Sequence, residues 1–450
     1  MMRRLAGAGL ALLAAACATL EPARAPDLRA CAEFFAQLDA RVDEAGVRDA
    51  QAARVRGFPY LRVSRLLASY RDEDAPRSLA RRMQALDLEA RRHELANLGA
   101  SDAPLERARD CGDRLREADL ADAQASARLL ERALVPEDYS TPSRLLGLYA
   151  ITRLPFIAGV RRYEQETREA FRTPLAPPPD GEVIRFAPTA GGNPGIHAPL
   201  LAAHAPVFEI EVTGDYDRPG ALGWRSGEPV PTVNAAEPVV YAHAAWTRYR
   251  GRTLQQLVYT IWFAERPPAF PGDILAGKLD GVVWRVTLAP DGEPLLYDSM
   301  HPCGCFHMFF PTPRAKPLPP PASALEWNFS PQAMPHLAKG ERARLRIATR
   351  THYVERVGAT GDAAGDARYA LREYDELRSM PHPEGGRRSI FGEHGLIAGT
   401  ERPERYLFWP MGIRSAGAMR QWGRHATAFV GRRHFDDADL LEQRFELDLR

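Results

Sequence analysis

The sequence predicts an α+β protein in which a helical N-terminal domain is followed by a mixed domain with a largely antiparallel sheet. Two observations support this prediction. Residues 27–172 are rich in Ala, Leu, Arg and Glu, and their apolar positions recur three and four residues apart, the period of amphipathic helices. Residues 197–450 instead contain short runs rich in Val, Ile, Thr and aromatic residues, which is typical of strands.

Five helices are expected in the first domain, because Gly and Pro interrupt the helical period between them. The stretch 145–160 in the last of them is notably apolar. Since Arg153 and Pro155 interrupt this stretch, we expect it to pack in the core of a helical bundle rather than to enter a bilayer. The expected helices are residues 28–45, 59–70, 78–98, 103–133 and 143–171.

Residues 173–196 are rich in Pro and Gly, a composition that predicts a linker between the two domains. Beyond it, Asp291-Gly292 separates two apolar runs and predicts a hairpin, because Gly accepts the positive φ of such turns. Residues 311–321 are proline-rich and are expected to form a surface loop. The expected strands are residues 207–213, 254–263, 282–288, 295–300 and 345–354, and short helices are expected within 369–378, 418–425 and 436–446.

The N-terminus has the layout of a secretory signal, with Arg3 and Arg4 before an apolar run over residues 5–16. That run is shorter than the roughly 20 apolar residues that span a bilayer. Where Ala14, Ala15 and Ala16 precede Cys17, the segment resembles a bacterial lipobox, with Ala14 in the place of the usual Leu.

The lipobox resemblance implies a signal peptide over residues 1–17 and a membrane anchor of lipid on Cys17. In lipoproteins the residue after the cysteine influences sorting, and Ala18 is not Asp. The resemblance therefore implies an outer-membrane protein that faces the periplasm. Cleavage without lipid, which would give a soluble periplasmic or secreted protein, is the alternative.

The chain contains five cysteines, and four remain if Cys17 carries lipid. Four thiols permit three pairings. An oxidising compartment favours disulfides, and the simplest arrangement joins Cys31 to Cys111 within the N-terminal domain. Cys303 and Cys305 are then left to each other or to a metal.

Composition and motifs exclude several classes of protein. The net charge of +1 creates no global field for nucleic acid, so no nucleic-acid partner is expected. The sequence has no Gly-rich phosphate loop, no nucleophile-elbow serine and no His-Glu pair of a zinc protease. These absences disfavour ATPases, common esterases and zinc proteases.

Residues 301–307, His-Pro-Cys-Gly-Cys-Phe-His, form the candidate site. Their imidazoles and thiols alternate along the chain, so an extended strand would place them on one face. Sulfur with imidazole nitrogen suits zinc or another transition metal. The candidate metal ligands are His301, Cys303, Cys305 and His307.

Distance limits this hypothesis, because an extended chain advances about 3.3 Å per residue and would separate the outer two histidines by roughly 20 Å. Either Pro302 and Gly304 bend the segment into a turn, or one neighbouring pair binds the metal together with donors from elsewhere. The remote donors considered are His243, His352, His394, His425, Glu265 and Asp298.

The same residues allow other chemistry. A Cys303–Cys305 disulfide would close a small, strained ring with a structural or redox role. A thiolate activated by a neighbouring histidine could act as a nucleophile. The leading expectation is a metal site. If the metal has an open coordination position, the protein would be a hydrolase that acts on an envelope component. The alternative is a non-catalytic structural or interaction lipoprotein with the disulfide and packed histidines.

The run from Leu254 through Phe310, with Tyr-Thr-Ile-Trp-Phe at residues 259–263, and the tail around Gln421-Trp422-Gly423 resemble a group of uncharacterised proteobacterial lipoproteins. The resemblance covers about the last half of the chain. It implies no particular activity and no protein partner.

Overall fold

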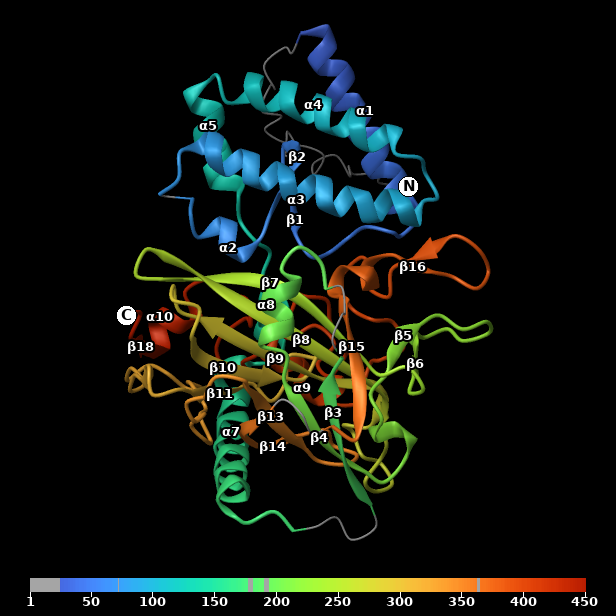
Figure 1. The fold of residues 1–450 in the computed structure, drawn as a ribbon. Helices are drawn as coiled ribbons and strands as arrows, with labels where there is room; N and C mark the ends of the chain where they lie inside the picture. The colour runs from blue at the N-terminus through green and yellow to red at the C-terminus, as the bar shows by residue number, and fades with distance from the viewer. Residues whose placement is uncertain (1–24, 72, 177–180, 190–193, 362–364) are drawn as a thin grey trace, which may run out of the picture.

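The computed structural model describes residues 25–450 apart from 72, 177–180, 190–193 and 362–364. The expected signal peptide 1–17 and its Cys17 lie outside the described residues. Figure 1 shows a helical domain packed on one end of a larger domain built around a sheet. The α+β class and the order of the two domains are confirmed.

The helical domain packs three long helices around a short antiparallel hairpin. Its core contains Phe35, Leu61, Leu79 and Leu115, all fully buried. The expected helix 59–70 is wrong, because its first half is a strand of the hairpin, and the expected helix 103–133 is broken in two. The elements are α1 (Pro26–Glu44), β1 (Ala53–Val55), β2 (Phe58–Val63), α2 (Arg65–Ala68), α3 (Pro76–Asn97), α4 (Ala103–Asp119) and α5 (Ala123–Arg132).

Cys31 on α1 and Cys111 on α4 form a disulfide, with their Cα atoms 5.2 Å apart. The expected pairing is confirmed. The bond links two helices that lie side by side in Figure 1 and closes a loop of 80 residues, so it restricts the unfolded chain substantially.

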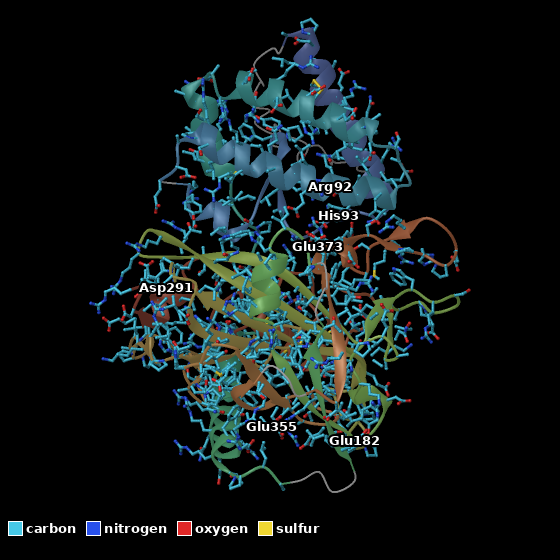
Figure 2. The ribbon with its side chains drawn as sticks, viewed as in Figure 1. Arg92, His93, Glu182, Asp291, Glu355 and Glu373 are labelled. Atoms are coloured by element: carbon cyan, nitrogen blue, oxygen red, sulfur yellow. A yellow bond between two sulfur atoms is a disulfide. The ribbon has the colours of Figure 1, made fainter. Side chains whose placement is uncertain are left out.

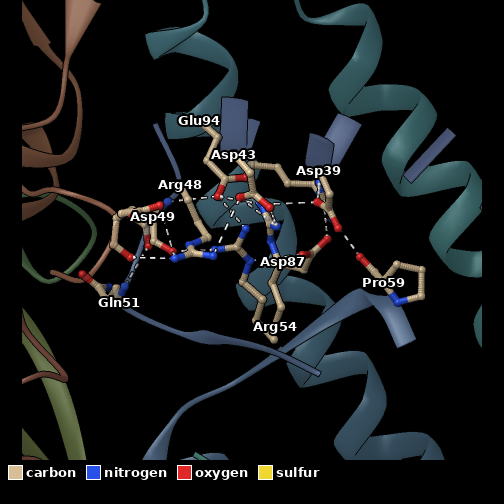
Figure 3. A network of polar contacts seen from close by, with 12 residues as sticks. Asp39, Asp43, Arg48, Asp49, Gln51, Arg54, Pro59, Asp87 and Glu94 are labelled. Carbon is tan, nitrogen blue, oxygen red and sulfur yellow. Dashed lines mark hydrogen bonds and ion pairs between the residues drawn. The ribbon is translucent and has the colours of Figure 1, made fainter. Parts of the chain in front are cut away.

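Buried ion pairs hold the hairpin against α3. Arg62 on β2 is fully buried, with its Nη2 atom 2.6 Å from Glu94 and its Nε atom 3.2 Å from Asp87. Figure 3 shows the network that surrounds Asp87 and Glu94, to which Arg54 and Asp39 contribute from β1 and α1. Each buried carboxylate therefore has a cationic partner, as burial of charge requires.

The two domains are joined by buried polar contacts. Arg378 of the sheet domain lies 2.8 Å from Asp49, which precedes β1. The amide of Gln421 donates a hydrogen bond of 3.2 Å to the same carboxylate. Figure 2 shows Arg92 and His93 of α3 at this junction, above Glu373 at the end of β15 (Ala367–Glu373). Residues 329 positions apart thus meet in the folded chain.

The main sheet of the described residues has ten strands in the order β11-β10-β9-β8-β7-β15-β3-β4-β13-β14. Six of its neighbouring pairs are antiparallel and three are parallel. The further strands are β3 (Glu182–Pro188), β4 (Val207–Val212), β7 (Val239–Tyr249), β8 (Arg252–Arg266), β9 (Gly277–Leu288), β10 (Pro294–Met300), β11 (Met308–Pro311), β13 (Glu341–Ile347) and β14 (Val354–Gly361).

The hairpin predicted at Asp291-Gly292 is confirmed, since β9 and β10 pair antiparallel and Gly292 has φ +87°. The segment 173–196 is more than a linker, because β3 lies inside it and pairs with strands on both sides. The expected strand 345–354 holds the end of β13 and the start of β14. In the tail, the expected helical region 369–378 holds the end of β15 followed by a short 3-10 helix, Tyr374–Arg378. Residues 418–425 contain no helix, and α10 (Leu440–Arg444) lies within 436–446.

The last expected helix belongs to the sheet domain. It consists of α6 (Thr141–Leu146) and α7 (Tyr149–Arg172), and Phe171 packs into the same core as the sheet. Its apolar N-terminal half is largely exposed, so the expected burial in a helical bundle is wrong. Among the described helices, none has both the length and the apolar character to cross a membrane.

Candidate functional site

Residues 301–307 form a tight turn between β10 and β11. The backbone N–H of Gly304 donates to the carbonyl of His301 at 2.8 Å, and the N–H of His301 donates to the carbonyl of Cys305 at 2.9 Å. Gly304 has φ +90° and packs closely on the backbone of Ala426, so a side chain there would overlap its carbonyl oxygen. The segment bends, as one of the two alternatives drawn from the sequence requires.

The turn does not bring its two histidines onto a common partner. The Nδ1 atom of His301 lies 3.1 Å from Asp280 on β9, whereas Nε2 of His307 lies 2.9 Å from Asp298 on β10. Each imidazole is buried and has its other ring nitrogen without a hydrogen-bond partner among the described residues. A carboxylate thus orients each histidine and leaves one nitrogen free for another group.

Asp280 is the centre of a larger buried cluster. Its second oxygen lies 3.0 Å from Nδ1 of His352, and Arg402 lies 3.4 Å from the first. The other nitrogen of His352 lies 3.4 Å from Asp217, and its ring stacks on Phe263 with centroids 3.9 Å apart.

Protonation differs among these groups. Burial favours neutral His352, but hydrogen bonds and charge from Asp217 and Asp280 prevail and raise the pKa of His352. Burial opposes ionisation of Asp280, yet His301 and Arg402 hold the pKa of Asp280 well below its usual range. Burial lowers the pKa of His301, although Asp280 opposes the shift. The cluster thus places His352, whose pKa is raised, between two carboxylates and beside His301, whose pKa is lowered.

Backbone strain concentrates around this cluster. Leu279, Phe306, Arg350 and His352 all have φ between +53° and +62°, in the left-handed region that side chains other than Gly seldom adopt. His352 is a cluster member, Leu279 directly precedes Asp280, and the ring of Phe306 lies 5.0 Å from that of His301. Strain of this kind persists only where surrounding contacts impose it and often accompanies function.

Cys303 and Cys305 are free, buried thiols, so the disulfide that the sequence allows is not formed. The backbone N–H of Cys305 donates to the sulfur of Cys303 at 3.4 Å. Burial opposes the Cys303 thiolate, but a hydrogen bond from the thiol of Cys305 and the charge of Arg402 lower the pKa of Cys303. The same hydrogen bond and burial raise the pKa of Cys305 well above its usual range. Cys303 is thus the more acidic thiol and Cys305 keeps its proton.

A cavity of about 510 Å³ lies against this turn and beneath α7. Cys305 and His307 line it, whereas Cys303 lines only a void of about 10 Å³. The more acidic thiol is therefore shut away from the space in which a ligand would fit. The walls of the cavity are mostly apolar and include Phe156, Tyr163, Phe306, Trp327, Phe329 and Phe408.

Few polar groups of the cavity remain available to a ligand. Arg433 and Glu326 also line it, but they lie 3.0 Å apart, and the second oxygen of Glu326 accepts backbone N–H groups at 2.9 and 3.1 Å. Glu404 lines the cavity as well, and burial raises the pKa of Glu404 to about 7. Burial lowers the pKa of His307 to about 3, so this imidazole is neutral.

These contacts do not supply a set of metal ligands. Among the described residues, no group of three or more His, Cys, Asp and Glu side chains is placed to hold a metal ion. The assignment of His301, Cys303, Cys305 and His307 as metal ligands stays a prediction.

Of the remote donors considered, Asp298 contacts His307, and His352 shares Asp280 with His301. His243 lines a separate cleft between the domains, and Glu265 lies exposed near the end of β8. His394 is half exposed, and His425 is buried beside Phe435.

Asp280 and Arg402 were missed in the sequence. One signal was available, because a charged Asp280 directly precedes the apolar run of β9 and must be buried if that run is a central strand.

Comparison of the chain with protein-family models, with curated proteins and with solved structures finds no match. The class that fold and site define is an α+β protein with an apolar cavity beside a strained, buried His-Asp-Arg cluster.

Proposed function

We propose that the sheet domain binds an amphipathic molecule that has an apolar chain and a neutral polar head. The observation that carries this proposal is the cavity beneath α7. Its volume of about 510 Å³ lies within the roughly 300–1,000 Å³ typical of ligand sites, and its aromatic walls with few polar groups fit an apolar chain.

The protonation states argue for a neutral head. At neutral pH the polar groups that line the cavity include a protonated thiol on Cys305, a neutral imidazole on His307, a carboxyl on Glu404 with a pKa of about 7, and a carboxyl on Glu164 whose pKa is raised by burial. The nearby guanidinium of Arg433 is already paired with Glu326. Hydroxyl, ester and protonated carboxyl groups can exchange hydrogen bonds with such a set, whereas a phosphate would lack a free cation.

We further propose that the chain is held in the outer membrane by lipid on Cys17 and faces the periplasm. The lipobox-like segment supports this location, and so does the Cys31–Cys111 disulfide, because disulfides persist in oxidising compartments. A ligand with an acyl chain would be abundant beside such an anchor.

The test is binding of a monoacylglycerol, with glycerol as the ligand that lacks the chain. Gly159 on α7 lines the cavity and has open space where a side chain would point. Gly159→Phe should fill that space and weaken monoacylglycerol binding measured by calorimetry about tenfold or more, since a filled pocket excludes the chain. Ala158→Phe, at an exposed neighbour that does not line the cavity, is the matched control. Equal affinity in both variants, or no monoacylglycerol binding to the wild type, rejects the proposal.

A metal-dependent hydrolase is the second candidate. The observation that favours it is that Asp280 and Asp298 each orient one histidine and leave its second nitrogen unpaired, as the outer partners of metal ligands do. Elemental analysis of the purified protein should then find stoichiometric zinc or another transition metal that is lost in Cys303→Ser, Cys305→Ser. A metal-free wild type with two free thiols removes this candidate.

A further inference from the structure

Large apolar side chains are exposed together on one part of the sheet domain. Eight of the fourteen that are exposed among the described residues lie on α6, just before α7, on the first turns of α7, on α9 (Arg405–Phe408) and on the residue after it. Leu146 is 79% exposed, Leu145 73% and Ile151 65%. We call this set the apolar surface, and its residues are Leu145, Leu146, Leu148, Ile151, Leu154, Tyr406, Leu407 and Trp409.

The two parts of the apolar surface are tied together. The backbone N–H of Ser140 donates to the carbonyl of Gly412 at 2.7 Å, and Nε of Arg144 donates to the carbonyl of Met411 at 2.8 Å. The rings of Phe156 and Phe408 lie 5.3 Å apart. In Figure 1, α7 runs along the sheet domain away from the helical domain, so the helical domain does not cover it. The exposed side chains thus lie on segments that contact one another, and exposed apolar side chains grouped in this way mark interaction sites.

The same segments are strongly basic. Residues 140–162 and 405–414 contain six arginines and no Asp or Glu, in a chain whose net charge is only +1. Arg161, Arg162 and Arg414 are exposed, and Arg162 pairs with Glu166 at 2.7 Å. Arginine at the rim of an apolar face can bury its stem against that face and keep its charge in the headgroup region.

We infer that the apolar surface docks onto a bilayer that contains anionic lipid. Exposed Leu, Ile, Trp and Tyr side chains bordered by arginine match the two requirements of interfacial binding, which are apolar insertion and attraction to negative headgroups. A second copy of the chain is disfavoured, because a twofold contact would bring the same arginine-rich patch of both copies together. This docking is separate from the lipid expected on Cys17.

Docking would also give the cavity a source of ligand. Leu407 belongs to the apolar surface and lines the cavity, and Pro155 and Phe156 line it from α7 directly after Leu154. A chain-bearing molecule could pass from the bilayer into the cavity without crossing water. This last step rests on the proposed function, whereas the docking itself rests only on the exposure and charge of the surface.

The experiment uses the chain from Ala18 onward, which keeps every described element and removes the segment expected to carry the signal and the lipid. Its binding to vesicles is measured by co-sedimentation, with phosphatidylglycerol in phosphatidylethanolamine or with phosphatidylcholine alone. Leu146→Glu, Ile151→Glu should lower binding to the anionic vesicles about tenfold or more, because it removes insertion and adds repulsion. The matched control is Ile196→Glu, Phe270→Glu, which places the same charges on exposed apolar residues outside the surface.

The expected result is binding of the wild type and the control to anionic vesicles, weaker binding to phosphatidylcholine, and loss in the test variant with an unchanged circular dichroism spectrum. Failure of the wild type to bind anionic vesicles overturns the inference, and so does equal binding of the two variants. A wild-type dimer in gel filtration that only the test variant dissociates would assign the surface to a second copy instead. Gly159→Phe should lose monoacylglycerol binding and still bind anionic vesicles. Vesicle docking and ligand binding are therefore tested independently of each other.

Discussion

The Nδ1 atom of His352 lies 3.0 Å from Oδ2 of Asp280, and both side chains are fully buried. Asp217 approaches the other nitrogen of the same ring, and Phe263 stacks on its face. An imidazole with a raised pKa is thus held between two carboxylates in the middle of the sheet domain. A buried charge of this kind is tolerable only while its partners remain charged.

His352 should therefore give the stability of the protein a specific pH dependence. The pKa of His352 is raised in the folded state, so its contribution is complete below the unfolded value of about 6.5 and disappears as pH rises through the folded pKa. His352→Asn should lower the free energy of unfolding by about 3–5 kcal/mol near pH 6, and by less at higher pH. Urea unfolding of both proteins across pH 6–9 measures this difference.

His307 is a control, because its contribution to the free energy of unfolding should change with pH in the opposite direction. Burial lowers the pKa of His307 to about 3, so its native form is neutral and its contribution falls as pH drops below the unfolded value of about 6.5. The stability difference between the wild type and His307→Asn should become smaller as the pH falls. The difference between the wild type and His352→Asn should be largest at the same low pH. Parallel pH profiles for the two variants would contradict these assignments.

The sequence predicts the local parts of this fold well and the long-range parts poorly. The periods of α1 and α3, the hairpin turn at Gly292 and the Cys31–Cys111 pair follow from residues near one another or from simple elimination. The strand β3 was missed because its residues become a strand only by pairing with β4 and β15, which lie elsewhere in the chain.

The cluster around Asp280 could not be predicted for the same reason. Its members come from β9, the turn at residue 301, the segment before β14 and the segment before α9, and only the sheet order brings them together. The turn of residues 301–307 was singled out correctly as unusual. Its two histidines each contact a carboxylate from a different strand, Asp280 on β9 and Asp298 on β10, and such long-range partners leave no mark in the local sequence.

Arg378 should couple the two domains. Its guanidinium is buried and contacts Asp49 at 2.8 Å and Asp375 at 3.0 Å, with Glu89 as a further partner. Arg378→Met leaves buried Asp49 without its ion-pair partner and with hydrogen bonds only from uncharged donors, which should cost about 3–5 kcal/mol and separate the melting of the two domains. Calorimetry should show two transitions in place of one.

The control for this change is Arg372→Met, since Arg372 pairs with Glu376 at a partly exposed position. Loss of such a pair should cost about 0–1 kcal/mol. A single, equally lowered transition in both variants would show that the junction does not depend on Arg378.

The disulfide should stabilise the helical domain selectively. Cys31→Ala, Cys111→Ala releases a loop of 80 residues and should lower the stability of that domain by about 2–5 kcal/mol. Hydrogen exchange read separately on α3 and on β8 locates the loss. Exchange that accelerates equally in both elements would mean that the two domains unfold as one unit.

Alanine substitutions at Gly304 and Gly292 distinguish the cost of a left-handed backbone from the cost of close packing. Gly304 lies in the turn of the candidate site, and Gly292 lies in the β9–β10 hairpin. Both have φ near +90°, but only a side chain at Gly304 would meet the carbonyl oxygen of Ala426. Gly292→Ala should cost about 1–2 kcal/mol through its left-handed backbone alone. Gly304→Ala should cost a further 1–3 kcal/mol or so, because the chain around Ala426 must move. That movement should also weaken monoacylglycerol binding, since Cys305 and Thr427 line the cavity on either side of this contact. Equal stability losses in thermal unfolding, with equal ligand affinity, would show that the turn tolerates the added methyl group without displacing the cavity wall.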